Sequence, residues 1–346
     1  MTTWPTVLGA LTRGEQLPEE DTRWAMHEVM AGAATPAQIA AFVVALRMRG
    51  ESPEDISALV DVMLDFAVRI DARGPAIDTC GTGGDGAHTV NISTMAAVLL
   101  ASTGVRVVKH GNRAASSKCG SADVLEALGV KIDLSPERTQ AVLDTIGLTF
   151  CFAPTFHPAL RHAGPTRREI GIPTVFNFLG PLANPAQPAA QIVGVADAKR
   201  APLIADVLRL RGTKAIVVRG DDGLDEASIF APTTCWPTWG ERFVLTPADL
   251  GISAVDADAL RGGDAAFNAD VARRLLDGEV SGRMAPIADA VALNAGIALV
   301  AWNGANGDAA AQPKDAIVRA FTAMRTALAS GAAGATLSAW AAETQR

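Results

Sequence analysis

The sequence predicts an α/β protein, in which a small all-helical domain precedes a larger domain with a mostly parallel sheet flanked by helices. Two observations lead to this fold class. Residues 1 to about 70 show only helical periodicity, and from Gly74-Pro75 onward apolar runs of strand length alternate with helix patterns. After Phe243 the chain becomes mainly helical again.

The N-terminal helices carry clear start and stop signals. The capping box Thr35-Pro36-Ala37-Gln38 has proline at the first helical position, and Gly50 ends the helix that it begins. Ser52-Pro53-Glu54-Asp55 begins the next helix. Apolar residues recur at helical spacing behind both starts, so each helix has one face for a core.

The alternating region predicts a sheet whose strands are joined by helices. We expect strands at 76–78, 105–108, 149–152, 190–195 and 214–218. We expect helices at 93–102, 121–128, 136–146 and 201–211, and later at 287–301 and 314–329. The proline-rich segment 165–188 fits neither pattern and is interpreted as a connection that leaves the α/β domain and returns.

Composition narrows the possible functions. The net charge of −7 argues against a nucleic-acid partner or an anionic membrane surface. The four cysteines are far apart and form no CxxC pair, which indicates reduced thiols and a cytoplasmic protein. The N-terminal residues have no basic region followed by an apolar one, so we expect no signal peptide.

A glycine-rich stretch, Asp78-Thr79-Cys80-Gly81-Thr82-Gly83-Gly84-Asp85-Gly86, follows the first expected strand and leads into a helix through Asn91-Ile92-Ser93-Thr94. Glycines let a backbone approach phosphate, and a helix start offers unpaired N–H groups. The same stretch also fits the weak dinucleotide fingerprint GxGxxG. The next strand then ends in Lys109-His110 rather than in an acidic residue, which weakens that alternative but leaves an NADP phosphate possible.

A second stretch, Lys109-His110-Gly111-Asn112-Arg113-Ala114-Ala115-Ser116-Ser117, combines cationic, amide and hydroxyl side chains separated by small residues. This composition suits a loop over a pyrophosphate. Both stretches follow parallel strands, so we expect them to meet at the carboxyl edge of the sheet.

Two further sets of charged residues do not indicate a function by themselves. Gly220-Asp221-Asp222-Gly223-Leu224-Asp225-Glu226 follows a strand, and its carboxylates suit Mg²⁺, although an acidic surface turn has the same composition. His157 precedes Arg167-Arg168, and a guanidinium is the preferred partner of a carboxylate, although an arginine pair is usually a solvated helix face.

Taken together, the motifs resemble the anthranilate phosphoribosyltransferases of tryptophan biosynthesis. The resemblance rests on seven stretches in order: GTGGD 81–85, NIST 91–94, KHGNRAASS 109–117, GSADVLEALG 120–129, RREIG 167–171, FNFLGPLANP 176–185 and GDDGLDE 220–226.

The resemblance implies transfer of the phosphoribosyl group from phosphoribosyl pyrophosphate to anthranilate, giving N-(5-phosphoribosyl)anthranilate and pyrophosphate, the second step from chorismate. It implies a cytoplasmic homodimer with two Mg²⁺ ions in each active site. The active site would lie between two domains. The helical domain would contain residues 1–72 plus a returning segment at about 168–188, and the α/β domain would contain residues 73–167 and 189–346. No general acid or base is assigned, so the reaction depends on departure of the leaving group through an oxocarbenium-like transition state.

The resemblance also implies roles for individual residues. Anthranilate would contact Gly81, Asn112, His157 and Arg167, and the metal would contact Ser93, Asp225 and Glu226. Phosphoribosyl pyrophosphate would contact Gly81, Gly84, Asp85, Thr89, Asn91, Ile92, Ser93, Thr94, Lys109, His110, Gly111, Asn112, Arg113, Ala114, Ala115, Ser116, Ser117 and Ser121.

Three other functions stay open at this point. A nucleoside phosphorylase of similar fold would bind free phosphate, and the pair Asp225-Glu226 argues against it because phosphorolysis needs no Mg²⁺. A non-enzymatic relative that binds nucleic acid fits the negative net charge poorly. An NADP-dependent oxidoreductase rests on the glycine fingerprint alone.

Overall fold

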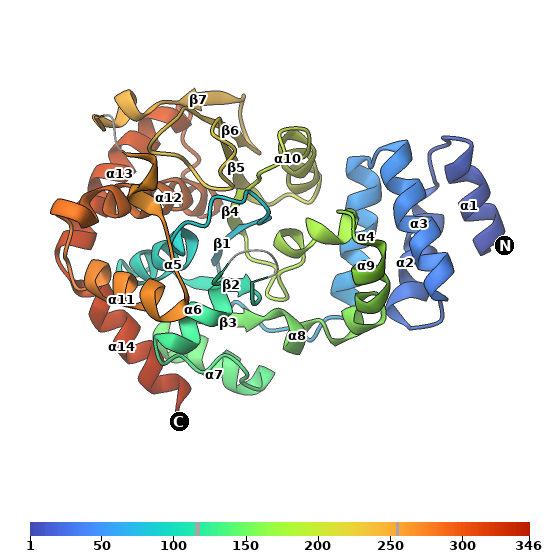
Figure 1. Ribbon diagram of the computed structural model, residues 1–346, viewed down its shortest axis with the longest axis horizontal. Coiled ribbons are helices and arrows are strands. Elements are labelled where there is room, and N and C mark those ends of the chain that lie inside the picture. The colour runs from blue at the N-terminus through green and yellow to red at the C-terminus, as the bar shows by residue number, and fades with distance from the viewer. Residues whose placement is uncertain (115–117, 254–255) are drawn as a thin grey trace.

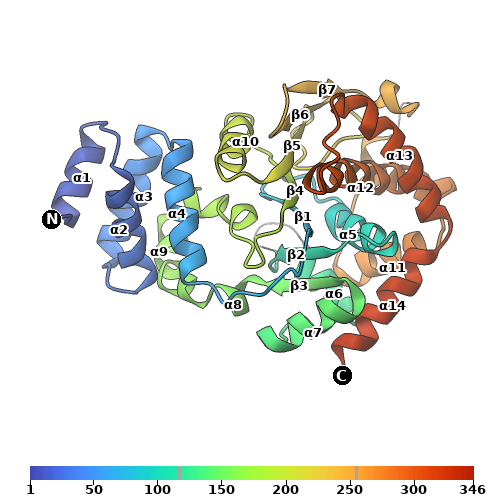
Figure 2. The same ribbon diagram turned by 180° about the vertical axis from the view of Figure 1, so that it is seen from behind.

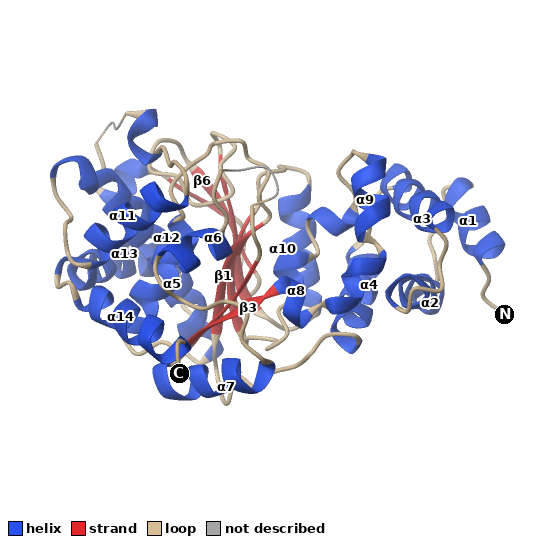
Figure 3. Cartoon of the chain, turned by 60° about the horizontal axis from the view of Figure 1, so that its bottom comes forward, coloured by secondary structure: helices blue, strands red, loops and turns tan. Residues whose placement is uncertain are grey.

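The computed structural model describes residues 1–114, 118–253 and 256–346. A group of N-terminal helices lies beside a larger body, and both ends of the chain are on the outside (Figures 1 and 2). In the larger body, helices cover both faces of one sheet of seven strands (Figure 3). This arrangement confirms the predicted fold class.

The N-terminal helices begin and end where the sequence signals lie. Capping boxes at Thr35 and Ser52 start α3 and α4, and Gly50 ends α3 with a positive φ of 93°. Helix α1 packs on α3, and α2 packs on α4. The four helices are α1 (Trp4–Thr12), α2 (Glu19–Met30), α3 (Pro36–Arg49) and α4 (Pro53–Asp65).

The sheet has the order β3-β2-β1-β4-β5-β6-β7, in which the first five strands are parallel and the last two pairings are antiparallel. The strands are β1 (Ile77–Gly81), β2 (Val107–Gly111), β3 (Leu148–Phe152), β4 (Ala190–Gly194), β5 (Lys214–Gly220), β6 (Thr233–Pro237) and β7 (Phe243–Leu245). Chain order reverses at β1, because β2 and β4 lie on either side of it. The carboxyl ends of these strands therefore border the crevice where ligands bind in open α/β sheets.

Three predictions about the sheet were wrong. Strand β1 runs to Gly81 rather than to residue 78, because its pairing with β4 continues to Gly81 opposite Gly194. Strand β2 runs to Gly111 rather than to residue 108, because its pairing with β3 continues to Gly111 opposite Phe152. The antiparallel strands β6 and β7 were not predicted. Both are short: β6 begins with two threonines and ends in proline, and β7 has only three residues. The pairing of β6 with β5 and of β7 with β6 defines them.

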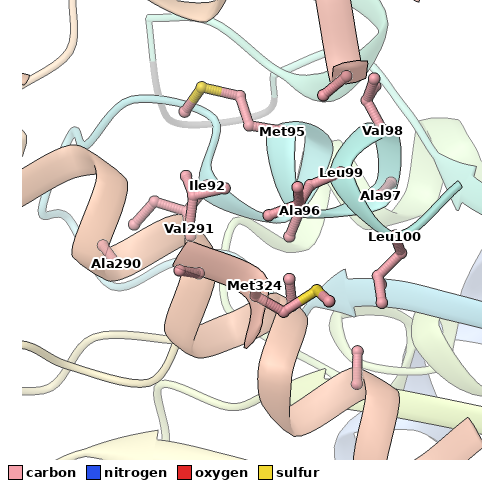
Figure 4. Close-up of a cluster of buried hydrophobic side chains, with 14 of the residues drawn as sticks. Ile92, Met95, Ala96, Ala97, Val98, Leu99, Leu100, Ala290, Val291 and Met324 are labelled. Carbon is pink, nitrogen blue, oxygen red and sulfur yellow. The ribbon is translucent and has the colours of Figure 1, made fainter. Parts of the chain in front are cut away.

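One face of the sheet is covered by α5 (Ile92–Ser102) and by C-terminal helices. Figure 4 shows α5 packed against α12 and α13 through Leu99, Val291, Met324 and their neighbours. The helices of this side are α6 (Ser121–Ala127), α7 (Pro136–Ile146), α11 (Ala265–Leu276), α12 (Ala285–Ala305), α13 (Pro313–Ala329) and α14 (Ala332–Thr344). Among the described residues, only the helical stretch Gly282–Ala305 has the length and hydropathy of a membrane span, and 83% of its apolar window is buried inside the protein.

The other face of the sheet joins the N-terminal helices in a single hydrophobic cluster. Strand residues alternate between the faces, so Ile192 belongs to the first cluster and Val193 to the second. Helix α10 (Arg200–Leu210) covers this face and contacts α4.

The irregular segment between β3 and β4 completes this second cluster. It contains α8 (Ala153–Phe156), α9 (Gly164–Ile170) and the short 3-10 helices η1 (Pro158–His162), η2 (Val175–Asn177) and η3 (Gly180–Leu182). Contact with the N-terminal helices begins at η1, which touches α2, and continues at α9, which touches α3.

Candidate active site

The glycine loop, residues 81–91, joins the carboxyl end of β1 to α5. Gly83, Gly84 and Gly86 have φ values of 67°, 85° and 69°, which only glycine adopts readily. Gly84 is exposed, whereas Asp85 and Thr89 are half-buried. The loop therefore presents backbone groups to solvent at the sheet's carboxyl edge.

Asn91 lies at the junction of this loop with α5, where it makes no side-chain cap. Its Nδ2 donates to the carbonyl oxygen of Cys119 (3.2 Å), and its Oδ1 accepts from Nδ2 of Asn268 (2.9 Å). Asn268 is buried in α11. Three distant parts of the chain thus meet at Asn91.

Side chains in the first turn of α5 point in two directions, toward the candidate site and toward the hydrophobic core. The Ser93 hydroxyl lies 3.3 Å from Nζ of Lys109. The hydroxyl of Thr94 is buried and finds no hydrogen-bond partner among the described residues. Ile92 points into the core beside α12 (Figure 4), so only its backbone can face a ligand.

Lys109 and His110 lie within β2 rather than in the loop after it, contrary to the sequence prediction. Lys109 is 2% exposed, and its ammonium donates to the carbonyl oxygen of Thr79 and to Ser93. The charge is therefore held beneath the glycine loop.

Further along the basic stretch, Asn112 and Arg113 are exposed, and Arg113 is already paired. Its guanidinium contacts the carboxylates of Asp123 (3.1 Å) and Glu126 (2.5 Å) and lies 5.7 Å from the ring centre of Phe152. Asp123 also accepts from the backbone N–H groups of Ala114 and Gly120. The predicted phosphate contacts Ala115, Ser116 and Ser117 lie outside the described residues.

Two predicted contacts lie where this stretch meets α6. Ser121 begins α6, and its hydroxyl donates to the carbonyl oxygen of Asn112 (3.2 Å). Asn112 is exposed just beyond β2, and Gly111 is the last residue of that strand. These residues therefore flank the carboxyl end of β2.

The acidic turn, residues 220–226, packs against the glycine loop instead of projecting into solvent. Oδ2 of Asp225 accepts from the backbone N–H of Gly83 at 2.6 Å. A Cβ at Gly194 would lie 1.7 Å from the backbone oxygen of Asp225, so the turn reaches this position only because β4 ends in glycine. Asp225 and Glu226 are half-buried, and the exposure predicted for them was wrong.

Crowding of carboxyl groups controls the electrostatics of this turn. Burial, and then the charges of Glu226 and Asp85, raise the pKa of Asp225 well above its usual value. Burial also raises the pKa of Glu226, to about 7, while Lys109 and hydrogen bonds from Ser93 lower it. The turn thus concentrates carboxyl groups that a cation would stabilise in their charged form.

The donor set fits magnesium. Carboxylate and hydroxyl oxygens are the hard ligands that Mg²⁺ prefers, and Mg²⁺ typically takes only one or two protein carboxylates and completes its shell with water and phosphate. The described residues contain no group of three or more acidic, histidine or cysteine side chains placed as a full metal cage. Hydrogen bonds from Ser93 to Glu226 bring this hydroxyl beside the carboxyl groups of the turn.

A cavity of about 220 Å³ lies beside the carboxyl ends of β1 and β2. All four residues predicted to contact an aromatic acid line it, together with His110, which the sequence analysis had assigned to the phosphate side. The lining residues are Met63, Cys80, Gly81, Thr82, His110, Gly111, Asn112, Ala153, His157, Leu160, Arg167, Phe176, Asn177, Gly180 and Pro181.

Burial favours the neutral form of both histidines of the cavity. Nδ1 of His110 lies 3.1 Å from the carbonyl oxygen of Gly180, and Nε2 of His157 lies 2.7 Å from that of Ala183. Because a carbonyl only accepts, these nitrogens carry the protons, and the opposite nitrogens are buried acceptors without a partner among the described residues. Burial lowers the pKa of His110 to about 3 and also lowers the pKa of His157.

Arg167 supplies the cationic group of the cavity. Its guanidinium lies 5.5 Å from the ring centre of Phe176, and burial lowers its pKa. Among the described residues no carboxylate pairs with it, whereas most other partly buried arginines have ion pairs. Arg168, one residue further along α9, is exposed. A half-buried guanidinium without a counter-ion can receive an anionic ligand.

One wall of the cavity was not predicted from the sequence. Phe176, Asn177, Gly180 and Pro181 belong to the wall segment, residues 176–184, which had been noted only as part of the motif FNFLGPLANP. Its proline and glycine content suggested a connection, and nothing local indicated which way it faces.

Comparison with known proteins agrees with this geometry. The chain matches the glycosyl transferase family in both of its parts, the helical bundle domain over residues 5–67 and the a/b domain over residues 73–333. It is 52% identical to the anthranilate phosphoribosyltransferase of Salinispora arenicola, over 98% of this chain and 96% of that protein. It is 50% identical to that of a Nocardioides species, over the full length of both.

Solved structures show the same likeness. The anthranilate phosphoribosyltransferase of Thermus thermophilus superimposes with a TM-score of 0.89 at 40% identity, over 98% of this chain and 99% of that one. The anthranilate phosphoribosyltransferase of Saccharomyces cerevisiae, in complex with phosphoribosyl pyrophosphate and Mg, superimposes with a TM-score of 0.87 at 27% identity, over 99% of this chain and 98% of that one.

Proposed function

This chain belongs to the anthranilate phosphoribosyltransferase family, and we propose that its glycine loop, Lys109 and acidic turn bind phosphoribosyl pyrophosphate while the cavity beside β1 and β2 binds anthranilate. The enzyme transfers the phosphoribosyl group to the anthranilate amine and releases pyrophosphate.

One observation supports the assignment of the two substrates to neighbouring places. Gly81 ends β1 and Asn112 directly follows β2, so they border the glycine loop and basic stretch on one side and the cavity on the other. A donor held at the loop would present its ribose carbon toward the cavity. Arg167 would hold the anthranilate carboxylate, and bidentate binding would direct the neighbouring amine at that carbon.

The protein groups act mainly on the leaving group. The amine is a weak nucleophile, so the barrier is lowered chiefly by stabilising pyrophosphate as charge develops on it. The buried ammonium of Lys109 lies beside Ser93 at the start of α5, and the exposed backbone of Gly84 would add a donor. Ser93, Asp225 and Glu226 would hold Mg²⁺, which when bound would supply Lewis-acid stabilisation of the leaving group's charge.

Several further properties belong to the same proposal. We propose two Mg²⁺ ions per site, a homodimer in the cytoplasm, and division of the chain at residues 1–72 and 73–346 with the returning segment added to the helical part. Asp85 beside the acidic turn supports a second ion. The four cysteines are buried thiols, as is typical of a reducing compartment.

The direct test follows anthranilate fluorescence with phosphoribosyl pyrophosphate and Mg²⁺ present. Fluorescence should fall, EDTA should stop the reaction, and added Mg²⁺ should restore it. Undiminished turnover in EDTA-treated, metal-free buffer would contradict the role of the acidic turn. Absence of any consumption under full conditions would contradict the function.

A further inference from the structure

The wall segment lies between two cavities. Gly180 and Pro181 line the cavity that contains Arg167, while Leu182 and Asn184 line a second cavity of about 200 Å³ that reaches Leu64 of α4. Phe178, Leu179 and Ala183 pack the segment into the second hydrophobic cluster. Between the two cavities, hydrogen bonds to its backbone add to this packing.

Side chains from three other elements hold the backbone of this segment. His110 of β2 donates to the carbonyl oxygen of Gly180, and Gln191 of β4 donates to that of Pro181 at 2.8 Å. His157, which follows α8, donates to the carbonyl oxygen of Ala183. The carbonyls therefore select the proton-bearing nitrogen of each histidine, so the segment's position and the chemistry of the cavity are linked.

Asn184 anchors the end of the segment. Its Nδ2 donates to Oδ2 of Asp78 in β1 (2.9 Å) and to the carbonyl oxygen of Val108 in β2 (2.8 Å). Its Oδ1 accepts from the backbone N–H of Ala186 (2.9 Å). Oδ1 of Asp78 in turn accepts from the backbone N–H of His110 (3.1 Å). One buried amide thus joins the two strands that end at Gly81 and Gly111 to the wall opposite them.

We propose that Asn184 is a positioning residue for the acceptor substrate: it sets the wall segment against β1 and β2, so that the carbonyls of Gly180 and Ala183 hold His110 and His157 in fixed and opposite tautomers facing the acceptor. This inference rests on the function proposed above. Asn184 itself lines the second cavity and lies behind the wall, so it acts through the histidines and not by contact with substrate.

The test compares three buried amides, each replaced by leucine. Asn184→Leu removes the anchor, and Gln191→Leu removes only the clamp on Pro181. Asn268→Leu is the matched control, because Asn268 is also buried but holds Asn91 beside the glycine loop. The KM for each substrate and the melting temperature are measured for all three proteins.

Asn184→Leu should raise the KM for anthranilate by on the order of tenfold, with the KM for phosphoribosyl pyrophosphate within about twofold of the parent. Gln191→Leu should give the same pattern, more weakly. Asn268→Leu should instead raise the KM for phosphoribosyl pyrophosphate and leave the KM for anthranilate nearly unchanged. If Asn184→Leu lowers the melting temperature while both KM values stay unchanged, or raises both equally, Asn184 is only structural and the proposal is wrong.

Histidine NMR of the unmodified protein tests the inference even if Asn184→Leu does not fold. The chain has five histidines, so ¹⁵N spectra can be assigned by single substitutions. His110 should be protonated at Nδ1 and His157 at Nε2 at neutral pH. The opposite tautomers would overturn the proposal. Because this readout needs no turnover, it separates a failure of the inference from a failure of the proposed function.

Discussion

Replacing Arg167 with alanine is expected to weaken the acceptor site selectively. The guanidinium lines the cavity and has no carboxylate partner among the described residues. It lies 5.5 Å from the ring centre of Phe176. The substitution therefore breaks no internal ion pair. Loss of this cation–π contact should cost about 1 kcal/mol of unfolding free energy or less, so the variant should stay folded.

The size of the effect follows from the site's partial burial. A hydrogen bond to a charged group contributes about 1.5–3 kcal/mol, which corresponds to about tenfold to a hundredfold in affinity. We therefore expect Arg167→Ala to raise the KM for anthranilate by that factor, with little change for phosphoribosyl pyrophosphate. Arg167→Lys should recover only part of the loss, because an ammonium cannot bind a carboxylate bidentately.

The assay is anthranilate fluorescence under steady-state conditions, with each substrate varied in turn. Arg168→Ala is the control, because Arg168 is exposed and points about 100° away on the same helix. A defect in Arg168→Ala but not in Arg167→Ala would show that the wrong arginine has been assigned. No defect in either variant would place the carboxylate site elsewhere.

Three other changes test the donor side. Lys109→Met should lower affinity for phosphoribosyl pyrophosphate by on the order of tenfold to a hundredfold in calorimetry; unchanged binding would make this lysine purely structural. Burial raises the pKa of Glu226 to about 7, so a metal must displace a proton below that pH. Mg²⁺ affinity should therefore increase as the pH rises through that range, by up to about tenfold per unit, and a flat titration between pH 6 and 8 would contradict this. Gly194→Ala would place a Cβ 1.7 Å from the backbone of Asp225 and should raise the Mg²⁺ requirement, on the order of tenfold if one ligand is lost. Gly240→Ala, which meets only an ordinary contact at 3.6 Å, should not.

Local chemistry in the sequence was enough to predict much of the fold. The capping boxes at Thr35 and Ser52 and the left-handed glycine at Gly147 are signals within a few residues of the elements they limit, and the structure has them there. The alternation of strands and helices placed the glycine loop and the end of β2 at one edge of the sheet, because parallel strands share their carboxyl ends.

Contacts between distant residues decided the rest. Lys109 is charged and was assigned to a loop, yet pairing with β3 keeps it in a buried strand, where Ser93 and Thr79 satisfy its ammonium. Asp225 looked like part of an exposed turn, yet glycines from two other strands allow it to pack inward.

The sequence by itself thus determined the fold class, the family and some of the residues that line the cavity, because caps, periodicity and motifs are properties of neighbouring residues. Only the tertiary structure decided which nitrogens of His110 and His157 carry protons, why Arg167 lacks a counter-ion, and how Asn184 joins two strands to the facing wall. These properties depend on burial and on partners many residues away in the chain, and a linear pattern contains neither.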